Sequence, residues 1–244
     1  MKKLIIANWK MQLKYRESLN LATKFKTVLK NKKSDIVICP DYLALPQVAE
    51  ILKNSSLKLG AQDSGVSNQG TYTGEVSPLN LKALGVRYVI LGHSERRLHF
   101  HETALIVNEK AKAALCLGLI PIICIGERLS EKEAGGTKKY LETELRRSLK
   151  DIKLRRATDL IIAYEPVWAI SGQQFAHPLL AAEAQKLHIF IKNKAEKILG
   201  HKVKVLYGGS VNSNNANNFL SQTEIDGLLV GGAALNLKSF QAIC

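Results

Sequence analysis

Residues 160–170 read Leu-Ile-Ile-Ala-Tyr-Glu-Pro-Val-Trp-Ala-Ile, and this stretch says most about the fold. The apolar run Leu160–Ala163 has the pattern of a strand buried on both faces, as strands of parallel sheets are. Pro166 has no amide hydrogen, so it ends the strand directly after the carboxylate of Glu165. A charge at the carboxyl end of a buried parallel strand predicts a reaction centre, although a solvated loop carboxylate is the common alternative.

Seven other apolar runs recur along the chain at intervals of about 32 residues, the length of a βαβ unit. The eight predicted strands are Leu4–Ala7, Asp35–Cys39, Leu57–Ala61, Tyr88–Leu91, Ile120–Ile125, Leu160–Tyr164, Val203–Tyr207 and Ile225–Val230. Amphipathic helical patterns lie between most of them, as at Ser18–Lys30, Thr103–Leu117, Lys138–Lys150 and Pro178–Leu199. An open doubly wound sheet is the alternative, but it usually has fewer strands and a G-x-G-x-x-G turn after the first. We therefore predict an α/β protein with a single (β/α)8 barrel of eight parallel strands over residues 1–244.

Composition limits the classes of protein to consider. A hydrophobic fraction of 46% allows a large core, and no apolar run approaches the ~18 residues that cross a bilayer. The apolar segment Leu4–Ala7 is too short for a signal peptide, so we expect a cytoplasmic protein without a membrane partner. The cysteines lack metal-ligand spacing, and Cys39, Cys116 and Cys124 lie in apolar stretches typical of reduced core thiols. We expect no metal.

The chain is strongly basic, with 35 Lys and Arg residues against 21 Asp and Glu residues, a formal charge of +14. Most of the basic residues fall in helical patterns at 24–33, 146–156 and 192–204, where they alternate with apolar residues as on solvated helix faces. No nucleic-acid-binding motif accompanies them, so we expect no specific nucleic-acid partner. The positive field should raise the local concentration of an anionic substrate.

Polar side chains follow the ends of several predicted strands, and in a barrel all these ends meet at one face. Asn8 and Lys10 follow the first strand, His93 follows the fourth, and Glu165 follows the sixth. Each alone is an ordinary surface residue, but together they should line one cavity. Ser94 is expected to cap a short helix whose positive end disfavours a proton on His93.

Two glycine-rich turns follow the seventh and eighth strands, Gly208-Gly209-Ser210 and Gly231-Gly232-Ala233. Glycine allows the backbone to approach a ligand closely, and helix N–H groups bind anions, so the pair predicts a phosphate site. A base, a cation, a neutral donor and a phosphate site together predict proton abstraction next to a carbonyl in a small phosphorylated substrate.

At these residues the chain resembles the triosephosphate isomerase family from end to end. The matching segments are Ala7–Met11, Gly74–Pro78, Gly92–Arg97, Cys124–Glu127, Ala163–Ile170, Tyr207–Val211 and Val230–Ala233. Any one is modest evidence, but all of them in this order are specific. The resemblance implies a TIM barrel that interconverts dihydroxyacetone phosphate and D-glyceraldehyde 3-phosphate in glycolysis and gluconeogenesis. It also implies that no cofactor is needed, because the reaction only relocates protons.

The resemblance further implies a role for each site residue. Glu165 moves a proton between the two carbons, and His93 polarises the carbonyl; this family is a known example of a glutamate base beside a neutral histidine. Lys10 stabilises the enediolate, Asn8 holds the carbonyl side, and Glu95 orients Lys10. The backbone N–H groups that should hold the phosphate belong to Ser171, Ser210, Gly231 and Gly232.

Two features of the resemblance concern segments outside the strands. The segment after Pro166 resembles the family's lid, but Ser171-Gly172-Gln173-Gln174-Phe175 stands where the family usually has Gly-Thr-Gly-Lys after Ala-Ile, so the chain departs from the pattern there. Ala234 likewise replaces the usual serine. The loop Asp63–Ser77 matches the family's intersubunit loop and implies a homodimer in which Thr73 inserts beside the partner's site.

Two other functions fit part of the sequence. A different phosphate-binding barrel would explain the two glycine-rich turns but not the segments around Lys10, His93 and Glu165. A disabled barrel that binds polyanions would explain the charge of +14, but the four catalytic candidates are all retained.

Overall fold

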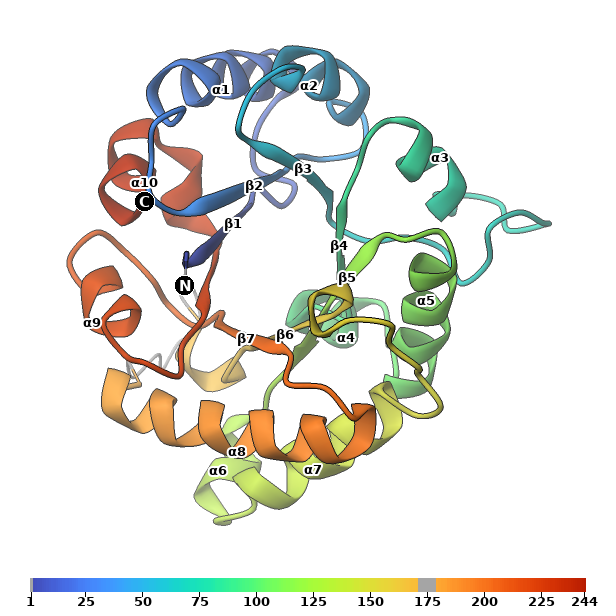
Figure 1. Cartoon of the computed structure of the whole chain (residues 1–244), viewed down its shortest axis with the longest axis vertical. Helices are drawn as coiled ribbons and strands as arrows, with labels where there is room; N and C mark the ends of the chain where they lie inside the picture. Colours follow the sequence, from blue (N-terminus) through green and yellow to red (C-terminus); the bar gives the residue numbers. More distant parts are fainter. Residues whose placement is uncertain (1, 171–178) are drawn as a thin grey trace.

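The computed structural model describes residues 2–170 and 179–244, and eight parallel strands close into a barrel in sequence order (Figure 1). The strands are β1 Leu4–Asn8, β2 Asp35–Cys39, β3 Lys58–Ala61, β4 Tyr88–Leu91, β5 Ile120–Ile125, β6 Ile161–Tyr164, β7 Lys204–Tyr207 and β8 Gly227–Val230. β1 pairs with β2 on one side and with β8 on the other, which closes the ring. The predicted (β/α)8 barrel is confirmed.

Helices connect the strands and surround the barrel. They are α1 Tyr15–Val28, α2 Leu45–Leu52, α3 Pro78–Ala83, α4 Ser94–His99, α5 Ala104–Cys116, α6 Leu129–Glu133, α7 Thr137–Ser148, α8 Ala181–Leu199, α9 Ala216–Leu220 and α10 Leu237–Ile243, with short 3₁₀ turns η1 Ala157–Asp159, η2 Val167–Ala169 and η3 Gly232–Leu235. The long helices pack by an apolar stripe, such as Leu21, Ala22 and Phe25 of α1. Among the described residues, no helix is both long and apolar enough to cross a bilayer.

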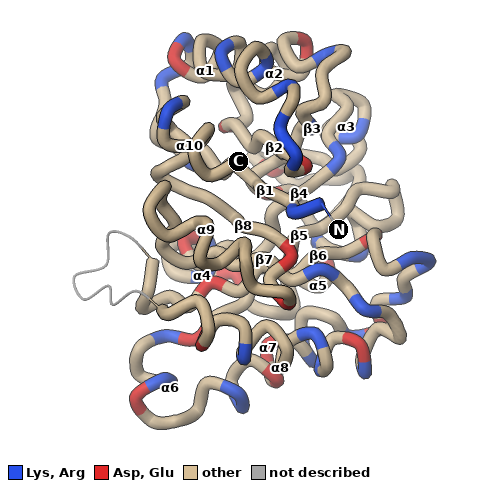
Figure 2. The backbone as a smooth tube through the Cα atoms, turned by 60° about the vertical axis from the view of Figure 1, so that its left-hand side comes forward, with Lys and Arg blue, Asp and Glu red and all other residues tan. Residues whose placement is uncertain are grey.

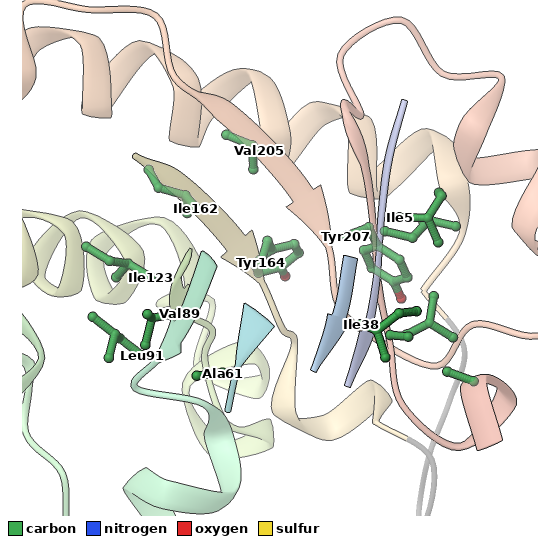
Figure 3. Close-up of a cluster of buried hydrophobic side chains, with 14 of the residues drawn as sticks. Ile5, Ile38, Ala61, Val89, Leu91, Ile123, Ile162, Tyr164, Val205 and Tyr207 are labelled. Atoms are coloured by element: carbon green, nitrogen blue, oxygen red, sulfur yellow. The ribbon is translucent and has the colours of Figure 1, made fainter. Parts of the chain in front are cut away.

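Strand alternation divides the core into two layers. The inner layer fills the barrel and consists of Leu4, Ile6, Val37, Cys39, Tyr88, Ile90, Ile122, Cys124, Ile161, Ala163, Leu206 and Leu229. The alternate residues pack outward against the helices; Figure 3 labels ten of them, from Ile5 on β1 to Tyr207 on β7. Because side chains alternate across each strand, one apolar run supplies both layers, as the continuous hydrophobic runs of the sequence predicted.

The strands β3, β6 and β7 begin one residue later than predicted from the apolar runs, and β8 begins two residues later. Ile225 is fully buried but lies outside the ladder, so its apolar character does not mark where pairing begins. Just before β8, the carboxylate of Asp226 accepts a hydrogen bond from the N–H of Val205 on the neighbouring strand β7, at 2.8 Å. At Gly227 the barrel closes so tightly that a Cβ atom would lie 1.8 Å from the Leu4 carbonyl oxygen.

The cysteines are only partly as expected. Cys39 and Cys124 are buried inside the barrel, and all four thiols are free. Cys116, expected in the core, is exposed at the last position of α5. The apolar composition of the surrounding segment concealed this, because one helix turn presents residues to both the core and the solvent.

The loop Asp63–Ser77 after β3 extends away from the barrel beyond α3 (Figure 1). Its base is closed by a hydrogen bond from the Gly65 N–H to the Val76 carbonyl at 2.8 Å, and Asp63 is buried there. Thr73, near the end of the loop, is exposed, as is the neighbouring Tyr72 ring. The long polar connection is therefore a projecting arm.

Candidate active site

A cavity of about 290 Å³ lies at the carboxyl ends of the strands. Five of the predicted residues line it: Asn8, Lys10, His93, Glu95 and Glu165. These residues come from the ends of three strands, β1, β4 and β6, whose convergence at one face follows from the closed topology. Local sequence alone gave no distance between them.

Glu165 is buried and held in a defined position. Its side chain is 2% exposed. One carboxylate oxygen, Oε1, lies 3.3 Å from His93 Nε2, and the other accepts a hydrogen bond from the Ser94 N–H at 3.1 Å. A Cβ atom on Gly208 would lie 2.8 Å from Glu165 Cγ, so glycine at that position leaves room for the glutamate. The carboxylate is thus desolvated and aimed at the imidazole.

The imidazole of His93 caps the helix α4. Its Nδ1 accepts a hydrogen bond from the Glu95 N–H at 3.2 Å, which requires that Nδ1 carry no proton and leaves the ring proton on Nε2. The expectation that Ser94 caps this helix is wrong by one residue: the ring nitrogen of His93 takes the capping role. Ser94 opens the helix and gives its N–H to Glu165 instead.

Contacts to both its backbone and its ammonium group fix the position of Lys10. Its φ of 52° lies in the left-handed region, which is costly for a residue with a side chain. The Lys10 N–H donates to Asn8 Oδ1 at 3.1 Å, and its carbonyl accepts from Gln62 Nε2 at 2.9 Å. The Nζ atom lies 2.6 Å from Glu95 Oε1. Burial would raise the pKa of the Glu95 carboxyl, but the hydrogen bond from Lys10 and nearby charge outweigh it and lower that pKa.

Two polar residues at strand ends, Gln62 and Glu127, were not among the predicted site residues. Gln62 follows β3 directly and also donates to the Cys39 carbonyl at 3.0 Å, so the strand-end rule applied elsewhere would have found it. Glu127 follows β5, is buried, and accepts hydrogen bonds from Trp168 Nε1 at 2.9 Å and the Tyr164 hydroxyl at 3.2 Å. Burial raises the pKa of Glu127, and these hydrogen bonds oppose the shift. Glu127 thereby holds residues on both sides of Glu165 in the sequence.

The residues predicted to bind phosphate differ in where the structure places them. Gly231 and Gly232 line the cavity, and a Cβ atom on Gly231 would lie 3.3 Å from Lys10 Cε. The Ser210 N–H donates to the Ala169 carbonyl at 3.0 Å. Ser171 and the departure 171–175 lie outside the described residues. Ala234 is buried in the turn η3. Among the described residues, no cluster of three or more His, Cys, Asp or Glu side chains is arranged to hold a metal ion.

A carboxylate beside an imidazole, with a lysine and two glycine-rich turns, defines an enzyme of the (β/α)8 barrel class. The triosephosphate isomerase family model matches residues 3–244. The chain is 43% identical over 241 residues to the triosephosphate isomerase of Clostridium botulinum (strain Okra / Type B1), covering 98% of this chain and 97% of that protein. It is 46% identical over 250 residues to that of Dehalococcoides mccartyi (strain CBDB1), covering 100% and 96%.

A solved structure agrees with the sequence matches. The triosephosphate isomerase of Bartonella henselae superposes with a TM-score of 0.89 at 34% identity, covering 100% of this chain and 98% of the other. The chain belongs to the triosephosphate isomerase family.

Proposed function

We propose that this chain interconverts dihydroxyacetone phosphate and D-glyceraldehyde 3-phosphate by proton transfer through an enediolate, in glycolysis and gluconeogenesis. The observation that supports the mechanism best is the Glu165–His93 pair, with 3.3 Å between Oε1 and Nε2, in a cavity that Lys10 also lines. A base, a neutral donor and a fixed cation are the three groups that enediolate chemistry requires.

Glu165 is the proposed base. It takes a proton from C1 of dihydroxyacetone phosphate and returns it to C2, so the carboxyl ends each turnover ionised. The Nε2–H of His93 donates to the carbonyl oxygen and moves protons between the two oxygens. The reaction consumes no oxidant and needs no cofactor. To reach a carbon acid, Glu165 Oε2 must leave the Ser94 N–H that it accepts from at 3.1 Å.

Lys10 and the glycine-rich turns are proposed to carry the anionic part of the substrate. The Lys10 ammonium offsets the enediolate and the phosphate dianion, Asn8 holds the carbonyl side, and Glu95 orients Lys10 through the 2.6 Å ion pair. The N–H groups of Ser171, Ser210, Gly231 and Gly232 are proposed to bind the phosphate. At Ser210 this requires exchange of the hydrogen bond to Ala169 for one to phosphate.

A homodimer is part of the proposal. Large apolar side chains are exposed in the loops after β1, β2 and β4, among them Met11 at 94%, Leu43 at 84% and Phe100 at 65%. Exposed apolar patches of this kind are typical of protein–protein contacts. Thr73 on the projecting arm is proposed to reach the partner's site near Asn8 and Lys10. Light scattering should give twice the chain mass, and Thr73→Arg should lower both that mass and the activity.

We propose that residues 1–244 form one catalytic domain that works in the cytoplasm, where thiols stay reduced, as the four free cysteines suggest. No membrane and no specific nucleic acid take part. Cell fractionation would test the location.

The decisive assay couples glyceraldehyde 3-phosphate formation to a dehydrogenase. Glu165→Gln should lower kcat by ~10²–10⁴ because the general base is lost, while Glu133→Gln, on the exposed helix α6, should leave it unchanged. Lys10→Met should raise KM and lower kcat together. An unaltered rate in Glu165→Gln would refute the mechanism, and a wild-type chain without activity on this substrate would refute the function.

A further inference from the structure

A second hollow lies at the opposite end of the barrel from the active site. It has a volume of about 520 Å³ and is formed by the last turn of α5, the start of β5 and residues 151–159 between α7 and β6. We call it the amino-terminal groove. The six residues of β5 span roughly 17 Å between the groove and the catalytic end. The groove shares no residue with the cavity that Glu165 and His93 line.

The amino-terminal groove is lined by more cations than its carboxylates can neutralise. Five basic residues line it, Arg87, Lys112, Lys153, Arg155 and Arg156, together with the two acidic residues Asp151 and Asp159. Asp159 forms an ion pair with Arg156, whose guanidinium lies 2.9 Å from its carboxylate. Across residues 2–170 and 179–244, the other four cations form no ion pair, which leaves Asp151 alone to balance them.

The cations are not scattered along one helix but converge from three segments. Arg87 precedes β4, Lys112 lies on α5, and Lys153 and Arg155 lie in the connection before β6. Bringing like charges to one hollow costs free energy unless an anion compensates them. Figure 2 shows Lys and Arg segments around α5 on the side of the molecule that carries the N-terminus.

Apolar side chains form part of the wall beneath the cations. Leu119 and Ile152 are buried, and Leu115 and Leu154 are partly exposed within the groove. The four unpaired cations are themselves exposed, so salt screens their attraction for a bound anion. The apolar wall gives room for an apolar group attached to that anion. Two arginines favour phosphate in particular, because a guanidinium matches two phosphate oxygens at once.

We propose that the amino-terminal groove binds an oligophosphate chain, either free or as the phosphate part of a nucleotide. A single phosphate dianion would engage only some of the four unpaired cations, whereas a chain of phosphates meets them from three sides. The volume of about 520 Å³ falls within the range of small-molecule sites. The site is independent of the isomerase reaction, since none of its residues reaches the catalytic cavity.

Cys116 provides a built-in reporter of occupancy. Its thiol is exposed, lines the groove, and lies one helical turn after Lys112 on α5. A ligand held by Lys112 would cover it. Cys39 and Cys124 are buried, and Cys244 lies outside the groove, so peptide mapping after maleimide labelling separates the four thiols.

The experiment compares sodium tripolyphosphate with ATP, each titrated calorimetrically into the full-length protein at low and at physiological salt. Removing three of four cations in Lys112→Gln/Lys153→Gln/Arg155→Gln should weaken binding by at least ~10-fold. The control Lys24→Gln/Lys30→Gln/Lys186→Gln removes the same charge from exposed sites outside the groove and should weaken it by less than ~3-fold. Both triple variants should keep wild-type isomerase activity, which also shows that they fold.

Labelling gives the second readout. Tripolyphosphate should slow maleimide modification of Cys116 by at least ~5-fold and leave Cys244 unaffected, with the slowing weakened at high salt. Tighter binding of ATP than of tripolyphosphate would identify a nucleotide, and equal binding would identify the phosphate chain itself. The proposal is overturned if the wild type binds neither ligand, if the two triple variants lose affinity equally, or if Lys10→Met abolishes binding. Should the groove variant fail to fold, Arg155→Gln is compared with the single control Lys24→Gln, and the proposal is overturned if the two lose affinity equally.

Discussion

His188 should make the protein progressively less stable as the pH falls below neutrality. The residue lies on α8, is 0% exposed, and contacts the Tyr164 ring edge-on with 6.1 Å between ring centroids. Burial lowers the pKa of His188 to about 3, and the positive charge of Lys192 adds to the shift. In the unfolded chain a histidine titrates near its ordinary value of 6.5.

The sign and size follow from proton linkage. Between pH 6.5 and pH 3 the unfolded chain binds a proton at this position and the folded chain does not, so lowering the pH favours unfolding. Each pH unit below 6.5 costs about 1.4 kcal/mol, which gives a loss of about 2 kcal/mol at pH 5. Asp63 acts in the opposite direction, because burial raises its pKa to about 6 and the folded state takes up its proton first.

The comparison that isolates His188 is the wild type against His188→Gln. Urea unfolding, followed by circular dichroism at fixed protein concentration, gives the free energy of unfolding of each protein at pH 7 and pH 5. The variant should be less stable at pH 7, but the difference should shrink by about 2 kcal/mol at pH 5. Asp63 cancels because both proteins carry it.

The matched control is His201→Gln, at a partly exposed position. It keeps His188 and should therefore retain the loss of stability that His188 causes on acidification. If the difference between wild type and His188→Gln changes by less than about 0.5 kcal/mol between the two pH values, the reasoning is refuted, since independent sites add within that margin.

Three further outcomes follow from the structure. Gly208→Ala should lower kcat, since its Cβ would lie 2.8 Å from Glu165 Cγ and must displace the base; an unchanged kcat in the coupled assay would contradict this. Gln62→Leu should lower kcat more than stability, because it frees the strained Lys10 backbone that Gln62 holds; Gln62→Glu, which lacks the amide donor, should do the same. Phe240→Ala should cost about 3–5 kcal/mol in urea unfolding, because it leaves a cavity beside Phe25, 5.0 Å away between ring centroids; a loss below about 1 kcal/mol would mean that the core refills.

Much of the barrel could be predicted because its strands are short, buried and regularly spaced. A strand buried on both faces needs a continuous apolar run. The sequence has such a run for each of the eight strands, as at Leu4–Ala7 and Leu160–Tyr164. The closed topology then brings strand ends together whatever the loops do. That is why Asn8, Lys10, His93 and Glu165 could be placed on one cavity from residues far apart in the chain.

Side-chain partnerships were not accessible in this way. In one buried cluster, Lys110 on α5 bonds Asp63 of the arm at 2.7 Å and contacts Glu102 in the connection between α4 and α5. Arg96 on α4 lies beside both carboxylates. Nothing in the local pattern around any of them indicates the others. The capping of α4 by His93 was missed for a related reason, because capping preferences describe hydroxyls and carboxamides more readily than a ring nitrogen.

The seam between β1 and β8 has a consequence for synthesis on the ribosome. Leu4 is paired with Gly227, so the second edge of β1, the first strand made, stays uncovered until β8, the last strand, has been made. Until then the nascent chain presents an open strand edge, the kind of surface that chaperones protect and that other chains can capture. A larger residue at position 227 would hinder the pairing of β8 with β1, because its side chain would clash with the Leu4 backbone.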